Sequence, residues 1–349
     1  MSMWQKLLKN VSLIHAFAIV FAMWGVYAIA QGTAHLEDSS FWVKRQLLWL
    51  GIGVCVSVLV ASIPFSRWYN WAYSLFGAML LLMLLLLVFG ERVNGMKGWF
   101  VLPWFSLQPS EILKPFFCLA LGRFYKACKE GGYYGHRLYI YCFGFTLLPV
   151  LLLLVQPDFG TALIFLMSFF LFYYLVEGAG PKLLGTIAAC LPMVIWAIWR
   201  KPYLWDRLKS FWNPDLYAEG TAYHAVQLKR ALANGAWTGK GAGQGVWSQG
   251  YVPLTHNDSI FSSFGEMQGL LGTLSVLGIF LFVALWSLQI YKTRQKYSII
   301  LFIILLLPLV QAFVHMSVNT LIFPVTGVNL PLFSYGGSSM IAMMIVLGL

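Results

Sequence analysis

The chain has 349 residues, of which 60% are hydrophobic and only 10% are charged, with a mean hydropathy of +0.75. A soluble domain carries about 25% charged residues, so this composition excludes a water-soluble globular protein. The formal net charge of +11 would suit a nucleic-acid-binding protein only if the chain were soluble. Apolar runs of about 20 residues are long enough for membrane helices, whereas the short alternating strands of an outer-membrane barrel are absent from the sequence. We therefore expect an all-α polytopic membrane protein.

The apolar runs predict ten transmembrane helices within a single membrane domain, residues 1–349. Lys6 and Lys9 precede the first run as in a signal peptide, but the run is too long for a signal-peptide core and is taken as a first span. The eighth run is long enough to include an extension at the membrane interface. The ten expected spans are residues 11–31, 46–64, 70–90, 109–126, 138–155, 159–177, 183–199, 259–290, 298–322 and 331–349.

The distribution of Lys and Arg orients the predicted bundle. If the N-terminus is cytoplasmic, the short inside segments hold eleven basic residues and the short outside segments hold four. The positive-inside rule favours this orientation, which also explains much of the positive charge without a nucleic-acid partner. The large loop 200–258, between the seventh and eighth spans, is then extracytoplasmic, together with residues 91–108, 156–158 and 323–330.

Ionisable side chains at the ends of membrane spans are candidates for function because charges are costly in lipid. Asp258, in THNDSIF, has no other acid within seven residues on either side. It is either a helix cap or a catalytic carboxylate, and Asn257 or Ser259 could provide the cap equally well. Glu266 follows two helical turns later, about 12 Å along the axis on roughly the same face. A mechanism with paired carboxylates is therefore allowed but not required.

Two further segments place charges where spans begin. In QPSEILK, residues 108–114, Glu111 and Lys114 are spaced to form a salt bridge on one helix face. Lys114 lies one turn deeper, so a single neighbour need not satisfy its charge. Because Lys114 and Asp258 both begin spans on the outer side, we predict that they face each other across a central cavity. In QPDFGTA, we expect Asp158 to cap a helix.

The outer loop 200–258 is basic and aromatic, which suits the membrane interface and also a sugar and diphosphate headgroup. Residues 221–234 predict a short amphipathic helix with His224 and Gln227 on one face. The glycines of residues 239–245 could bring backbone amides to a phosphate, but a flexible interfacial loop is the default expectation. The prolines and glycines of residues 324–339 break a helix near the membrane surface, and such backbone needs protein or a wet cavity to cover it.

Together these motifs resemble the SEDS family (shape, elongation, division and sporulation) over nearly the whole chain. The resemblance implies a peptidoglycan glycosyltransferase that polymerises lipid II on the outer face of the bacterial cytoplasmic (inner) membrane, beside a class B penicillin-binding protein. The family's catalytic Asp falls on Asp258, its motif Trp on Trp99 and its motif Lys on Lys114. The short N-terminus and the last motif favour the RodA branch over FtsW, and hence a role in cell elongation and shape. The motifs that carry the resemblance are NGMKGW (94–99), QPSEILK (108–114), QPDFGTA (156–162), the series of residues 223–245, THNDSIF with GE (255–266) and PVTGVNLPLFSYGGSS (324–339).

The chain departs from the family pattern around these motifs. Leu254 stands where the family usually has Glu, Asn257 replaces Thr, and Ser259 replaces Phe. A second Glu after Glu266 is Met267, and the usual Arg before the motif Trp is Gly98. These outlying groups are missing while the motif Asp is kept, which favours the Asp as the indispensable group.

The mechanism expected from this resemblance uses Asp258 as the general base for an acceptor hydroxyl. Lys114 would hold Asp258 ionised and then turn to the departing diphosphate, aided by Lys97 or Arg207. A divalent cation, Mg or Mn, could assist, although the sequence contains no recognisable metal-binding motif. Two alternatives stay open, a lipid II flippase and a non-catalytic scaffold of the wall-synthesis complex. The expected substrate-binding residues are Lys114, Trp99, Lys97, Glu111, Arg207, His224, Gln227, Glu266 and Ser338.

Overall fold

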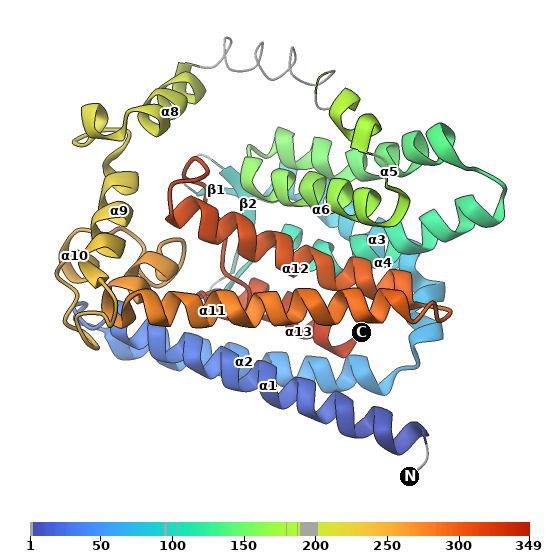
Figure 1. Cartoon of the computed structure of the whole chain (residues 1–349), viewed down its shortest axis with the longest axis horizontal. Coiled ribbons are helices and arrows are strands. Elements are labelled where there is room, and N and C mark those ends of the chain that lie inside the picture. Colours follow the sequence, from blue (N-terminus) through green and yellow to red (C-terminus); the bar gives the residue numbers. More distant parts are fainter. Residues whose placement is uncertain (1–2, 94–95, 103, 179, 187, 189–201) are drawn as a thin grey trace.

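The computed structural model describes residues 3–93, 96–102, 104–178, 180–186, 188 and 202–349 (Figure 1). Within these residues, seven helices are long and apolar enough to cross a membrane, which confirms seven of the ten expected spans. The chain is therefore a multi-pass membrane protein. The helices that contain these spans are α1 (Met3–Gly32), α2 (Ser39–Ser62), α3 (Phe65–Phe89), α5 (Gly135–Val155), α6 (Phe159–Glu177), α11 (Ile260–Lys292) and α12 (Ser298–Asn319).

The other three expected spans differ from the seven. Residues 109–126 lie in α4 (Pro109–Glu130), which carries six charged side chains along its length and is largely buried. Residues 331–349 contain only a short apolar helix, α13 (Gly337–Gly348), preceded by irregular backbone. Most of residues 183–199 fall outside the described residues. Ten spans and the orientation of the bundle thus stay predictions.

Helix α4 lies at the centre of the bundle, where it contacts α3, α5, α12 and α13. Phe117 and Leu113 on α4 are fully buried in the largest apolar cluster, together with Phe165 on α6 and Phe302 on α12. Side chains on lipid-facing helices gain nothing from leaving water, so close packing of this kind holds the helices together. In Figure 1, α11 and α12 run side by side across the middle, which fits their extensive contact.

Residues 91–108 form a small antiparallel sheet, which corrects the all-α expectation. The sheet has the order β1 (Glu91–Val93), β2 (Met96–Val101), β3 (Ser106–Leu107). Val93 pairs with Met96, so only two residues join β1 to β2. The sequence between the two strands is Asn-Gly, a dipeptide typical of β-hairpins, so this pairing was predictable from the sequence.

The outer loop contains α8 (Pro202–Trp212), the 3-10 helix η1 (Pro214–Tyr217), α9 (Tyr223–Gly235) and α10 (Val246–Gly250). Helix α9 confirms the amphipathic helix expected over residues 221–234. Helices α9 and α10 contact α11, whereas α8 extends away from the body of the molecule in Figure 1.

The first part of α11 is set apart from the rest by a kink at Gly269, where φ is 68° and ψ is −166°. At the kink the helix loses its regular hydrogen bonds, and the outer loop replaces them. Leu270 N donates to Ala236 O at 2.9 Å, and Lys240 N donates to Glu266 O at 3.0 Å. The kink separates residues 260–268 from the rest of the eighth expected span, and their position at the membrane interface stays a prediction.

The glycines of the loop allow two backbones to approach each other closely. A Cβ at Gly239 would lie 2.1 Å from Met267 O, and one at Gly235 would lie 2.1 Å from Gly265 O. Gly241 N donates to Met267 O at 3.1 Å. This corrects the expectation of a flexible interfacial loop, because this part of the glycine series packs on α11 and uses amides to bind its carbonyl groups.

Candidate functional site

Asp258 lies two residues before the start of α11, and the residue is partly buried. It packs against Gly327, where a Cβ would lie 3.2 Å from Asp258 Oδ2. In the part of the chain that the structure describes, no side chain or amide is hydrogen-bonded or ion-paired to this carboxylate. Burial raises the pKa of Asp258 to about 6. The residue is thus a carboxylate free to accept a proton near neutral pH.

The cap interpretation of Asp258 is wrong. The N-cap of α11 is Ser259, and no side chain of its own segment caps the helix. The side chain of Asn319, at the end of α12, caps the start of α11 instead, although it is 57 residues away from Ser262 in the sequence. Its Oδ1 accepts from Ser262 N at 3.1 Å, and its Nδ2 donates to Asp258 O at 3.0 Å. One amide side chain therefore fixes both the backbone of Asp258 and the first turn of α11.

Asn319 belongs to a buried polar stripe on α12, formed with Gln311 and His315 at intervals of four residues. Gln311 Nε2 donates to Asn329 O at 2.9 Å, and His315 Nδ1 donates to Val328 O at 2.6 Å. The stripe holds the irregular backbone of residues 323–336 beside the site. None of these three residues was among the predicted site residues, although regularly spaced polar residues in an apolar span indicate function.

Lys114 forms the salt bridge expected with Glu111, with Nζ and Oε1 2.5 Å apart. The Lys114 side chain is fully buried, and its Nζ also donates to Gln311 Oε1 at 2.8 Å. It forms no ion pair with Asp258, which corrects the prediction that Lys114 is the partner of that carboxylate. Glu111 on the same helix and Gln311 on α12 satisfy the lysine instead.

Asp158 caps α6 as expected, since its Oδ1 accepts from Thr161 N at 3.0 Å. Burial raises the pKa of Asp158, while the hydrogen bonds from Thr161 and the nearby charge of Lys114 act in the opposite direction. Gly160, in the first turn of α6, packs on residues 326 and 328. The starts of α4 and α6 and the segment 323–336 thus meet beside Asp258.

His224 on α9 reaches the residue after Asp258. His224 Nε2 and Ser259 Oγ are 2.7 Å apart, and Ser259 Oγ donates to Pro253 O at 2.6 Å. Burial lowers the pKa of His224, so the ring is neutral at physiological pH. Gln227, one turn later, is buried, and its Oε1 has no hydrogen-bond partner among the described residues. The side chain of Arg207 lies outside the described residues.

Glu266 holds the outer loop rather than sharing chemistry with Asp258. Its buried carboxylate accepts from Asn234 Nδ2 at 2.7 Å, Trp247 N at 2.9 Å and Ser248 N at 2.6 Å. Because these three donors occupy both carboxylate oxygens, Glu266 has little remaining capacity to accept hydrogen bonds from a substrate. The geometry does not favour a paired-carboxylate mechanism or a substrate contact at this residue.

Three other expected residues are Lys97 and Trp99 on β2 and Ser338 on α13. Lys97 Nζ donates to Leu87 O at 2.8 Å. Trp99 is partly buried on β2. Ser338 Oγ accepts from Gln108 N at 3.0 Å, which joins α13 to α4. Lys97 and Ser338 therefore stabilise the framework around the site, and neither contacts Asp258. Among the described side chains, no three His, Cys, Asp or Glu residues gather as metal ligands.

Comparison with known proteins identifies the family. Residues 5–349 match the cell cycle protein family of FtsW, RodA and SpoVE. The chain belongs to this family. It is 31% identical to a probable peptidoglycan glycosyltransferase FtsW of Trichlorobacter lovleyi, over 98% of this chain and 91% of that protein. A protein of the same name from Halorhodospira halophila is also 31% identical, over 100% of this chain and 91% of its own length.

Solved structures of the family are similar over nearly their full length. RodA of Thermus thermophilus superposes with a TM-score of 0.69 at 27% identity, covering 97% of this chain and 93% of that one. A chain from a peptidoglycan synthase complex that coordinates polymerization and crosslinking gives a TM-score of 0.79 at 29% identity, covering 97% and 95%. The SEDS assignment is thus confirmed. The preference for RodA over FtsW is not, since the curated relatives named above are FtsW proteins.

Proposed function

We propose that this protein is a peptidoglycan glycosyltransferase that polymerises lipid II on the outer face of the bacterial cytoplasmic membrane, with Asp258 as its general base. The observation that carries the proposal is that this carboxylate has a raised pKa and, among the described residues, no hydrogen-bond or ion-pair partner. The residue is partly buried, and burial raises its pKa to about 6. The names of the relatives support the reaction class.

The proposed reaction is a single displacement. Asp258 takes the proton of an acceptor sugar hydroxyl as the hydroxyl oxygen bonds to the anomeric carbon of the donor. The bond from that carbon to the diphosphate oxygen breaks, and the lipid diphosphate leaves with the electron pair. One displacement on an α-linked donor inverts the centre and yields a β-1,4 glycan. General base catalysis of this kind contributes about 10²–10⁴-fold, and it works best when the pKa of the base is near the working pH.

The departing diphosphate needs positive charge near it. Lys97 and Arg207 are the proposed sources on the outer surface, and a divalent cation would supply further neutralisation. Lys114 is already neutralised by Glu111, so its proposed contribution is to orient the start of α4 and, through Gln311, the stripe on α12. Trp99, His224 and Gln227 are proposed to line the path of the substrate.

The proposed partner is a class B penicillin-binding protein, which crosslinks the strands made here. The support is the similarity to a chain from a complex that coordinates polymerization and crosslinking. Within the family we propose an elongation role, on the basis of the sequence GVNLPLFSYGGSS and the similarity to RodA of Thermus thermophilus. Complementation of strains depleted of RodA or of FtsW tests this, and rescue of the FtsW strain alone would contradict it.

The test of the activity is polymerisation of labelled lipid II by the purified protein and its transpeptidase partner in detergent. We expect glycan strands from the wild type and none above background from Asp258→Ala. The matched control Asp215→Ala removes an exposed acid of the same loop and should polymerise normally. Circular dichroism and thermal melting establish that each variant is folded.

The same assay separates the alternatives. A flippase would fail to polymerise in detergent, where no membrane separates two leaflets, yet would move lipid II across vesicles. A scaffold would tolerate the loss of the carboxylate, so a folded Asp258→Asn variant would support growth in a depletion strain. Either result would overturn the proposed activity.

A further inference from the structure

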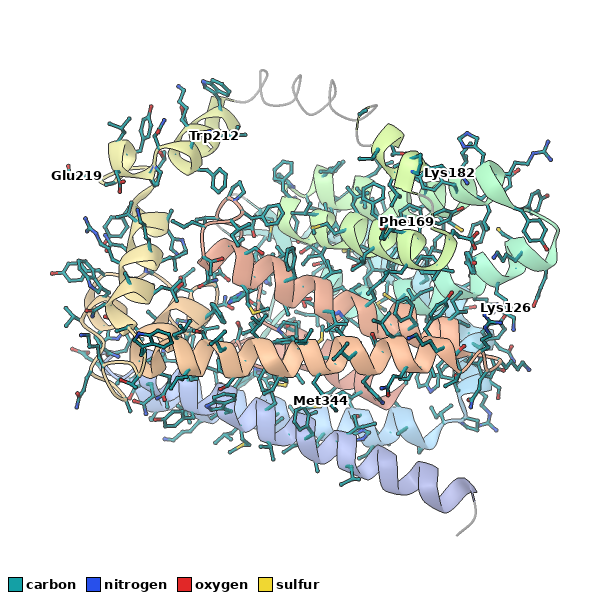
Figure 2. The ribbon with its side chains drawn as sticks, in the orientation of Figure 1. Lys126, Phe169, Lys182, Trp212, Glu219 and Met344 are labelled. Atoms are coloured by element: carbon teal, nitrogen blue, oxygen red, sulfur yellow. The ribbon has the colours of Figure 1, made fainter. Side chains whose placement is uncertain are left out.

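A second polar site lies at the other end of α11 from Asp258. Residues of α4, of the ends of α11 and α12 and of the connection between them line an open cavity of about 570 Å³. Beyond the kink at Gly269, α11 continues from residue 270 to residue 292, which corresponds to about 35 Å, so we place the cavity at the opposite predicted membrane surface. Lys126 marks its position in Figure 2. The charged residues that line it are Lys126, Lys129, Lys292, Arg294, Lys296 and Glu130.

The cations around this cavity are only partly neutralised. Lys129 forms an ion pair with Glu177 at 2.6 Å, and Lys126 lies 3.8 Å from Glu130. The other three cations, Lys292, Arg294 and Lys296, are exposed and have no acidic partner among the residues that the structure describes. A cluster of like charges without counter-ions raises the local positive potential and attracts an anion.

The segment that carries Lys296 and Ser298 is fixed by packing. Between these two lining residues, the ring of Tyr297 packs against Phe65 with centroids 4.9 Å apart, and it faces Lys296 Nζ at 5.2 Å. Arg294 has a φ of 52°, which few residues other than Gly adopt and which sets the turn between the helices. Ser298 begins α12 at the cavity wall, so the positive end of that helix adds to the field.

We infer that this cavity binds the phosphate group of an anionic phospholipid from the cytoplasmic leaflet. Basic pockets between transmembrane helices on the cytoplasmic side bind phosphate-bearing headgroups. Tyr291 and Ile299 give the wall an apolar part, suited to the glycerol and the first acyl carbons. The positive-inside rule explains why basic residues are numerous on this side, but it does not require three unpaired cations to converge on one cavity. The lipid would brace the ends of α4, α11 and α12.

Native mass spectrometry of the purified full-length protein tests this inference, with phosphatidylglycerol and phosphatidylcholine as probes. The pocket variant carries Lys292→Gln, Arg294→Asn and Lys296→Gln, with Asn chosen because it tolerates a positive φ. The matched control carries Arg67→Gln, Arg137→Asn and Lys182→Gln, three cations of the same predicted side outside the cavity. We expect phosphatidylglycerol to be retained over phosphatidylcholine, and at least tenfold less of it on the pocket variant. The control should change by less than twofold.

Three results would overturn the inference. They are equal loss of lipid in the two triple variants, equal retention of the two lipids by the wild type, and full displacement of phosphatidylglycerol by millimolar inorganic phosphate. The last would indicate a site for a free anion. The single variants Lys292→Gln and Lys296→Gln should each lower retention about threefold, and they decide the matter if the triple variant does not fold.

Discussion

The pKa of Asp258 is set by burial of the residue and not by a neighbouring charge. Burial alone raises its pKa to about 6, and the lysine expected to hold it ionised pairs with Glu111 instead. A carboxylate without a partner is a stronger base than one in a salt bridge, so this arrangement suits proton abstraction. The amide of Asn319 fixes the backbone while leaving the carboxylate free.

Such a carboxylate should reduce stability at neutral pH. The folded-state pKa of about 6 lies above the ordinary value of 3.8, so ionisation disfavours the folded state. This cost is absent below about pH 4, grows up to about pH 6 and is complete above it. We predict that Asp258→Asn raises the melting temperature at pH 7.5 and that the gain falls by about half at pH 5. Asp215→Asn should show no such trend, and a gain for Asp258→Asn that is independent of pH would contradict the account.

The pair Glu111 and Lys114 should behave as a buried unit. Lys114→Met leaves a buried carboxylate unpaired, which typically costs about 3–5 kcal/mol. We predict that adding Glu111→Gln restores most of that stability in equilibrium unfolding. If the lysine served only the fold, the double variant would also recover polymerisation. Continued loss of activity in a stable double variant would show that Lys114 acts on the substrate.

At the scale of elements, the features that depend on local sequence could be predicted. Seven spans, the helix α9 and the Asp158 cap follow from hydropathy, amphipathic spacing and first-turn chemistry. The kink of α11 and the role of the loop glycines could not be predicted in this way. They depend on backbone contact between Gly239 and residue 267, which are far apart in sequence.

A substitution at Gly269 tests the contact between the kink of α11 and the loop glycines directly. Its φ of 68° suits glycine, and a Cβ there would lie 2.4 Å from Gly239 N. We predict that Gly269→Ala lowers the melting temperature by several degrees and speeds proteolysis of residues 236–250. Gly278→Ala, on the same helix and with open space around it, should be neutral or slightly stabilising. Equal behaviour of the two variants would contradict the proposed role of the kink.

At the scale of the whole molecule, the motifs predicted which segments form the candidate site, but the contacts within it could not be read from the sequence. The segments around residues 111, 158, 258 and 327 do converge, as their positions at the starts of spans suggested. The salt bridge of Lys114 with Glu111 followed from their spacing on one helix, but the sequence could not show that Gln311 is the second partner of the lysine. The packing of α4 on α12 brings Gln311 to Lys114, and no motif in the sequence indicates that contact.

The orientation of the bundle is testable by cysteine labelling in spheroplasts. In a background without native cysteines, Leu216→Cys lies in the exposed outer loop and Thr293→Cys in the exposed connection after α11. We predict that a membrane-impermeant maleimide labels the first in intact spheroplasts and the second only after lysis. The reverse pattern would place Asp258 on the cytoplasmic side and remove the proposed reaction from the outer face.

The most direct test of Asp258 as the base is the rate of lipid II polymerisation between pH 5 and pH 8. With a pKa of about 6, the wild-type rate should fall roughly tenfold per pH unit below pH 6 and level off above it. Asp258→Asn should be at least about 10²-fold slower and should lack this dependence. A wild-type rate that is flat through pH 6, or a folded Asn variant within about tenfold of the wild type, would contradict the assignment of Asp258 as the general base.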